Sequence, residues 1–283
     1  MEEVTLNNGI SMPLEGFGVF QITDPQECEA ATWGALKAGY RMIDTAAAYG
    51  NEEAVGRAIR KSGIPREEIF LISKLWLQDY GYENAQKGLE TSLEKLGQEY
   101  VDLYLLHQPL GDTLGAWRAL EDAYQEGKVR AIGVANFSPA QLTDFCESVT
   151  LRPAVDQVEI HPFLTQEMAL TTMNEYGVQP QAWAPLAEGN FGIFSHPLLA
   201  EIGRRYGKSP AQVALRWNVQ RGISVIPKTT HCQYMKQNLD IWNFQLTEEE
   251  MAQVGSLDLG HSEIVDVSNP TFIRNLHYWK IHA

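Results

Sequence analysis

Four side chains could together carry out a proton transfer, judging by their chemical types and their spacing along the chain. Asp44 and Tyr49 lie on either side of a small-residue turn in the stretch YRMIDTAAAYG. Lys74 ends the apolar run IFLISK, and His107 ends the run YVDLYLLH. A phenol with a pKa near about 10 is a poor acid at neutral pH unless its anion is stabilised. A nearby lysine ammonium stabilises that anion, and a carboxylate keeps the lysine charged and in place.

Each of the four residues therefore has a distinct expected role. We expect Tyr49 to donate the proton, with a pKa that Lys74 lowers, and Asp44 to hold Lys74. His107 can orient a carbonyl oxygen or assist the proton transfer. Taken singly, the residues also have structural explanations: Asp44 as a helix cap, Lys74 reaching solvent and His107 within the core. Their combination favours catalysis.

The elements that must position these residues are apolar runs that alternate with helical patterns. Eight runs are nearly continuous, as expected of parallel strands buried on both faces. They are GFGVF, YRMIDT, IFLISK, YVDLYLLH, VRAIGVANF, AVDQVEIH, PQAWAP and ISVIPK. The segments between them read as helices that begin with capping signals. These signals are Asp24-Pro25, Ser138-Pro139 with Gln141, Ser209-Pro210 with Gln212, and Thr247 with Glu250. Apolar stripes at 82–97 and at 112–127, the latter including Leu114, predict two more helices.

Eight such units without a visible linker predict an α/β fold, a single (β/α)8 TIM barrel domain over 1–283. An N-terminal β-hairpin precedes it, with Asn8-Gly9 supplying the positive φ angles of a tight primed turn, and a short C-terminal tail follows. The alternative is an open doubly wound sheet, which needs a phosphate-binding glycine loop. Gly16 and Gly18 are followed by Gln21 where a third glycine should stand.

In a barrel, functional side chains gather where the strands end at the C-terminal face. We therefore expect one set of strand tips to meet at a common mouth: Asp44, Lys74, His107, Asn136, Gln157, Trp183 and Lys228.

Composition narrows the classes of partner. The 283 residues carry a formal net charge of -14, which argues against nonspecific binding to nucleic acid or an anionic membrane. The cysteines Cys28, Cys146 and Cys232 form neither a metal-binding pattern nor a disulfide framework, so we expect no metal and a reduced cytoplasmic protein. The start MEEVTLNNG predicts no signal peptide, and no apolar run is long enough for a membrane span.

Several longer motifs resemble those of the aldo-keto reductase superfamily. They are GYRMIDTAAAYGNEEAVGRAI, ISKLW, LLHQP, ALEDAYQEGKVRAIGVANF and the late IPK. The resemblance runs from about Val4 to about His282, and it is strongest to the bacterial branch with 2,5-diketo-gluconate and methylglyoxal reductases. It implies a barrel that binds NADPH in extended form without a Rossmann domain. It also implies an intact catalytic tetrad of Asp44, Tyr49, Lys74 and His107.

The resemblance also implies a cofactor site. Asn136 and Gln157 would hold the nicotinamide carboxamide, and Trp183 would stack on the ring. Leu186 would lie along the pyrophosphate. The adenosine end would meet Lys228, Thr229, Tyr234 and Asn238. Tyr234 stands where the family has an arginine for the 2′-phosphate, which predicts a weakened NADPH preference with NADH possible.

Four further positions depart from the family pattern: Ala135 for serine, Asp156 for asparagine, Ala184 for serine and Gln237 for glutamate. The carbonyl pocket would be lined by Phe20, Trp76 and Gln108. Because Gln108 is polar and the tail after Leu257 is short, we expect small polar carbonyls as substrates.

These observations predict a monomeric NAD(P)H-dependent oxidoreductase that reduces aldehydes and ketones. One alternative is a cofactor-binding sensor or regulatory subunit with slow turnover. A second is an aldolase or isomerase that uses Lys74 as a Schiff base, which fits less well because Asp44 would keep that lysine protonated.

Overall fold

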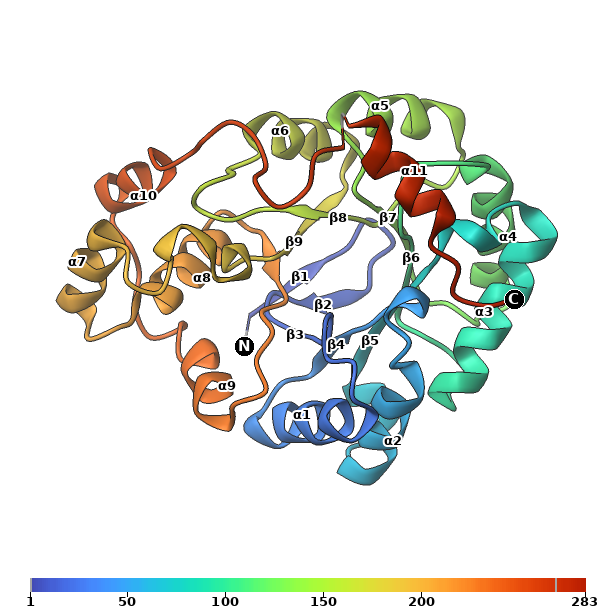
Figure 1. Ribbon diagram of the computed structural model, residues 1–283, viewed down its shortest axis with the longest axis horizontal. Helices are drawn as coiled ribbons and strands as arrows, with labels where there is room; N and C mark the ends of the chain where they lie inside the picture. Colours follow the sequence, from blue (N-terminus) through green and yellow to red (C-terminus); the bar gives the residue numbers. More distant parts are fainter. Residues whose placement is uncertain (1, 268) are drawn as a thin grey trace.

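Eight parallel strands form the centre of the molecule. The structure is a computed structural model that describes residues 2–267 and 269–283. Each strand pairs with the next along the chain, and helices surround them (Figure 1). The strands are β3 Phe17–Gly18, β4 Met42–Asp44, β5 Phe70–Leu75, β6 Leu103–Leu106, β7 Ile132–Ala135, β8 Val155–Glu159, β9 Gln179–Trp183 and β10 Ser224–Val225. Each strand overlaps one of the eight predicted runs.

The sheet closes on itself between its first and last strands. Gly16 N donates to Val225 O over 2.8 Å, Val225 N donates to Leu14 O over 2.9 Å, and a parallel bridge joins Glu15 to Val225. Closure satisfies the backbone groups of both edge strands, which an open sheet would leave unpaired. The predicted (β/α)8 barrel is therefore confirmed, and the open doubly wound sheet is excluded.

The helices begin where local capping chemistry places them. Both halves of the capping box form at Ser138, Ser209 and Thr247, and Asp24 accepts a hydrogen bond from Glu27 N. One detail of the predicted stripes is wrong: Leu114 is 43% exposed, because it lies in the first turn of its helix beside solvent. The helices are α1 Pro25–Ala38, α2 Glu52–Ser62, α3 Tyr82–Leu96, α4 Thr113–Gln125, α5 Pro139–Ser148, α6 Glu167–Tyr176, α7 Pro197–Tyr206, α8 Pro210–Gln220, α9 Cys232–Leu239, α10 Glu248–Gly255 and α11 Pro270–Tyr278. Short 3₁₀ turns occur at η1 Ala47–Tyr49, η2 Arg66–Glu68, η3 Leu77–Asp79 and η4 Ala187–Gly192.

The predicted N-terminal hairpin is present, as β1 Glu3–Thr5 paired with β2 Ser11–Pro13. Its turn differs from the prediction, because Gly9 has a positive φ of 89° and Asn8 does not. Leu6 N donates to Ile10 O instead, so the loop holds three residues rather than two. The asparagine side chains are then free to donate to backbone carbonyls at the start of the barrel strands, Asn8 to Arg130 O and Asn7 to Pro153 O.

Two apolar clusters divide the core. One lies between the strands and the helices, and it includes Trp117 and Trp217. The smaller one fills the barrel interior, where Met12 of the hairpin packs with Met42 and Leu105. The hairpin therefore closes the N-terminal end of the barrel and leaves the C-terminal end for the site.

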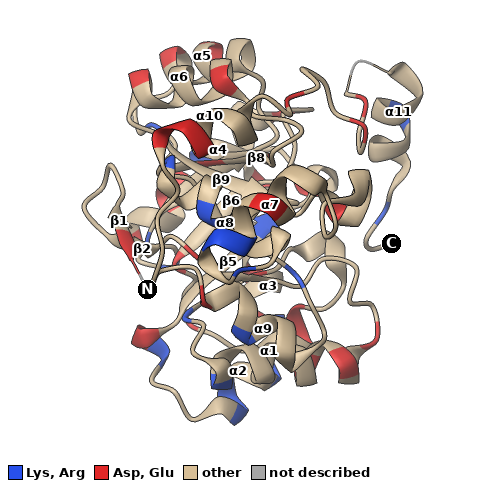
Figure 2. Cartoon of the chain, turned by 90° about the vertical axis from the view of Figure 1, so that its left-hand side faces the viewer, with Lys and Arg blue, Asp and Glu red and all other residues tan. Residues whose placement is uncertain are grey.

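The segment after α10 crosses the open end of the barrel. In Figure 1 it runs in dark red past the strand ends, carries α11 and finishes beside α3. On the side drawn in Figure 2, acidic and basic residues are interspersed over the helices. Within residues 2–267 and 269–283, no helix is both long and apolar enough to cross a membrane.

Candidate active site

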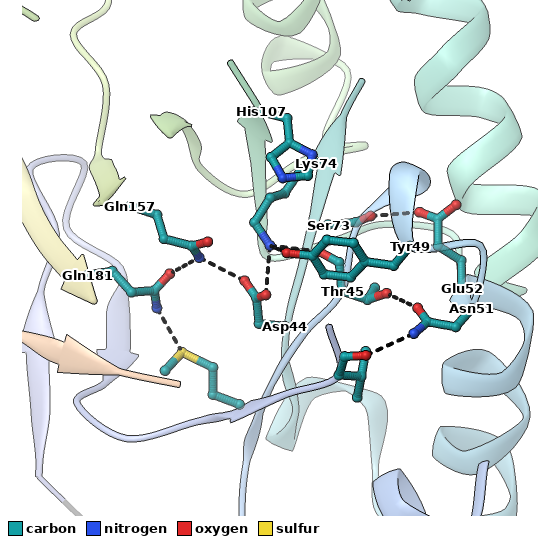
Figure 3. Close-up of polar contacts among 12 residues, drawn as sticks. Asp44, Thr45, Tyr49, Asn51, Glu52, Ser73, Lys74, His107, Gln157 and Gln181 are labelled. Atoms are coloured by element: carbon teal, nitrogen blue, oxygen red, sulfur yellow. Dashed lines mark hydrogen bonds and ion pairs between the residues drawn. The ribbon is translucent and has the colours of Figure 1, made fainter. Parts of the chain in front are cut away.

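Asp44, Lys74 and Tyr49 form a connected group at the C-terminal end of the barrel (Figure 3). Asp44 is the last residue of β4, Lys74 lies on β5, and η1 brings Tyr49 back over both. Lys74 Nζ donates to Asp44 Oδ1 over 2.6 Å, to Thr45 O over 2.9 Å and to the Tyr49 hydroxyl over 3.4 Å. All three ammonium hydrogens therefore have acceptors. An amine held this way has no free lone pair, which argues against Schiff-base chemistry.

The electrostatics of Tyr49 differ from the expectation. Burial and the Asp44 carboxylate raise the pKa of the Tyr49 phenol well above its usual range. Burial lowers the pKa of Lys74, and the Asp44 carboxylate opposes that shift. The expected lowering of the phenol pKa is therefore wrong for this structure. The physical reason is that the tyrosinate would lie in a desolvated site close to a carboxylate.

His107 follows β6 and packs edge-on against the rings of Tyr49 and Trp76, at centroid distances of 5.7 and 5.2 Å. Burial and the Lys74 charge hold the pKa of its imidazole well below the usual range. Within the described chain, the buried Nδ1 atom has no hydrogen-bond partner. His107 is thus a neutral imidazole with unused hydrogen-bonding capacity beside the phenol.

Two amides adjoin this group and retain hydrogen-bonding capacity: Gln157, in the middle of β8 rather than at its predicted tip, and Asn136, directly after β7. Gln157 Nε2 donates to Asp44 Oδ2 over 2.8 Å and to Gln181 Oε1 over 2.7 Å, so among the described residues Gln157 Oε1 remains an open acceptor. Asn136, in the left-handed region at φ 65°, donates to His107 O and accepts from Trp183 Nε1. Both amides are therefore held in fixed orientations.

A cavity of about 490 Å³ lies above these groups. Its walls include Phe20, Trp76 and Gln108, the three residues predicted to line a carbonyl pocket. Gln108 binds Tyr80 through its backbone only, so within the described chain its side-chain amide has no partner.

Sequence reasoning missed the outer wall of the cavity. Six apolar residues of the C-terminal segment line it: Ile264, Val265, Val267, Phe272, Leu276 and Trp279. Trp76 Nε1 donates to Trp279 O over 2.8 Å, and the two rings pack 5.0 Å apart. The short tail after Leu257 therefore supplies apolar surface to the cavity, which removes one of the two grounds for expecting small polar substrates. Phe272 in α11 and Trp279 directly after it were the available aromatic signal in the sequence.

The predicted cofactor residues divide into two groups. Trp183, Leu186 and Lys228 line the cavity together with Asn136 and Gln157. Several non-glycine residues between Ala184 and Phe191 have positive φ, so this loop follows a strained path along the cavity edge. Thr229, Tyr234 and Asn238 do not line the cavity; they lie on or just before α9.

Among the described residues, no three His, Cys, Asp or Glu side chains come together as metal ligands. The fold and the site together define a class: a closed (β/α)8 barrel with a buried carboxylate–lysine pair, a partly buried phenol and a neutral imidazole at its mouth.

Comparison with known proteins narrows this class. The model of the aldo/keto reductase family matches residues 16–259. The 9,11-endoperoxide prostaglandin H2 reductase of Trypanosoma cruzi is 46% identical over 90% of this chain and 91% of that protein. Glyoxal reductase of Bacillus subtilis is 43% identical over 91% and 93%, respectively.

The chain is also similar to solved structures of aldo-keto reductases. An aldo-keto reductase from a Medee basin deep-sea metagenome library has a TM-score of 0.91 and 41% identity, covering 94% of this chain and 98% of that chain. A Bombyx mori aldo-keto reductase in complex with NADP has a TM-score of 0.89 and 34% identity, covering 94% and 95%, respectively. The chain belongs to the aldo/keto reductase family.

Proposed function

We propose that the protein reduces aldehydes and ketones to alcohols with NAD(P)H, and that Tyr49 is the general acid. One observation carries this proposal: the buried Asp44–Lys74 pair places a cation 3.4 Å from the oxygen of the partly buried Tyr49 phenol, which lines the cavity. The relatives named as reductases support the same class of reaction.

The raised pKa of Tyr49 suits this role. The phenol is fully protonated at neutral pH, and a forming alkoxide is a much stronger base than tyrosinate, so the proton moves as charge develops on the oxygen. Lys74 then stabilises the tyrosinate through its 3.4 Å contact. The neutral His107 ring can donate an N–H to the carbonyl oxygen and hold it near the phenol.

The residues present fit a nicotinamide cofactor, which supplies the hydride when bound. Gln157 offers an open acceptor, and Asn136 keeps one donor and one acceptor position free beside Trp183. This set matches a carboxamide on a flat ring. Lys228, which also lines the cavity, supplies a cation for phosphate. NADPH is the favoured cofactor, with a preference weakened by Tyr234 and with NADH accepted.

The apolar C-terminal segment that lines the cavity indicates the class of substrate. Because the outer wall is built from Phe272, Leu276, Trp279 and their neighbours, the favoured substrate carries its carbonyl on an apolar body of ring size. The Gln108 amide provides one polar contact at that wall. A panel of aldehydes and ketones, assayed with both cofactors, tests this assignment. Higher kcat/KM for glyceraldehyde than for aromatic aldehydes would contradict it.

Tyr49→Phe tests the function. The variant should lose at least about 100-fold in turnover, the lower end for general acids, while NADPH still quenches tryptophan fluorescence with an unchanged Kd. Retention of more than about a tenth of wild-type turnover would refute the acid assignment. A wild-type protein that binds NADPH but turns over no carbonyl in the panel would favour the sensor alternative.

Three further expectations belong to this proposal: residues 1–283 unfold as one domain, the protein is a monomer, and it acts in the cytoplasm. Light scattering after size exclusion and a single coincident unfolding transition by two probes test the first two. Localisation of a tagged chain in cells tests the third.

A further inference from the structure

A polar chain runs through the barrel interior from its closed end to the site. Ser224 on β10 donates to Pro13 O of the hairpin over 3.2 Å. Gln181 on β9, fully buried, donates from Nε2 to Ser224 Oγ over 3.2 Å and accepts at Oε1 from Gln157 over 2.7 Å. Figure 3 shows Gln181 joined to Gln157, and Gln157 joined in turn to Asp44.

The direction of each hydrogen bond is set by the two ends of this chain. Pro13 O is a carbonyl and can only accept, so the Ser224 hydroxyl donates to it and accepts from Gln181 Nε2. That orientation presents Gln181 Oε1 to Gln157. At the other end the Asp44 carboxylate also only accepts. Gln157 therefore directs its amide nitrogen toward both Gln181 and Asp44.

The consequence for Gln157 is a fixed amide. Both Nε2 hydrogens are used, one on Asp44 Oδ2 over 2.8 Å and one on Gln181 Oε1 over 2.7 Å. The remaining polar atom, Oε1, is available to the cavity that Gln157 lines. Without Gln181, the second hydrogen would lose its acceptor and the amide would keep a single anchor.

We propose that Gln181, supported by Ser224, is a positioning residue that holds the Gln157 carbonyl oxygen toward the cavity as the acceptor for a carboxamide N–H. This inference rests on the proposed function. Gln181 acts through Gln157 and does not line the cavity. Because Gln157 also binds Asp44, the same chain joins the carboxamide site to the carboxylate that holds Lys74.

Gln181→Met tests the proposal, because methionine has a similar length and offers the Gln157 amide only a weak thioether acceptor in place of the amide oxygen. The ligands are NADPH and its reduced 3-acetylpyridine analogue, in which a methyl group replaces the carboxamide NH₂. Kd values come from quenching of tryptophan fluorescence. Loss of one hydrogen bond should weaken NADPH binding about 3- to 10-fold and leave analogue binding unchanged.

Ser224 provides the matched pair of variants. Ser224→Ala should shift selectivity in the same direction by a smaller factor, and Ser224→Thr, which keeps the hydroxyl, should retain wild-type selectivity. These variants carry the test if Gln181→Met fails to fold. Equal weakening of both ligands, or no change with either, would overturn the proposal. A wild-type protein that binds neither NADPH nor NADH would instead overturn the proposed function.

Discussion

Replacement of Lys74 by methionine separates the charge of this residue from its packing. Lys74 and Asp44 are 0% and 1% exposed, and Nζ lies 2.6 Å from Oδ1. Methionine keeps most of the side-chain length but leaves the carboxylate with Gln157 as its remaining donor in the described chain. Removing one partner of a buried ion pair costs about 3–5 kcal/mol, because the other charge stays desolvated. We expect the free energy of unfolding to fall by that amount at neutral pH.

Two controls isolate the cause. The double variant Lys74→Met with Asp44→Asn removes both charges, so it should regain most of the lost stability and still lack turnover. Arg66→Met weakens a different, partly buried pair, with Asp102 at 2.8 Å, and should lower stability without changing turnover at a permissive temperature. Urea unfolding gives the stabilities and NADPH oxidation with an aldehyde gives the turnover. A double variant no more stable than Lys74→Met would refute this account.

Two further predictions concern the cofactor and the pH dependence of stability. Tyr234→Arg should strengthen NADPH binding by about 1.5 kcal/mol and have little effect on NADH binding. This value is the lower end of the range for hydrogen bonds to charged groups, because residue 234 is 48% exposed. Equal gains for both cofactors would show that residue 234 does not face the 2′-phosphate. Burial raises the pKa of Glu15 from 4.5 to about 8, so between those values the folded chain keeps a proton that the unfolded chain releases, and the free energy of unfolding falls as pH rises. Glu15→Gln should remove this contribution to the pH dependence of the free energy of unfolding, which is on the order of 4 kcal/mol between about pH 5 and pH 8. Equal pH dependence of the free energy of unfolding in the wild type and the variant would contradict the prediction.

Local patterns predicted the elements well. Capping boxes at Ser138, Ser209 and Thr247 form as expected, because they depend on residues three positions apart. Two details were predicted wrongly: a positive φ at Asn8 in the hairpin turn, and burial of Leu114. The first depends on backbone angles, and the second depends on where the helix meets solvent.

The polar chain through Gln181 could be predicted from the sequence only in part. Gln157 and Gln181 are the middle residues of β8 and β9, and the register pairs them directly. The alternation of side chains along a strand could have placed both inside the barrel. The direction of their hydrogen bonds could not be predicted, because it depends on Pro13 O and Ser224, which only the closed barrel brings together.

The sequence by itself determined the barrel and predicted Asp44, Lys74 and His107 at its mouth, because apolar runs and position at or near a strand end are local properties. The tertiary structure decided how those residues behave and what surrounds them. The pKa of Tyr49 depends on its burial and on the nearby Asp44 charge, both products of folding. Trp279 reaches Trp76 across 203 positions of sequence, so the wall it builds over the cavity follows from long-range packing that no local pattern encodes.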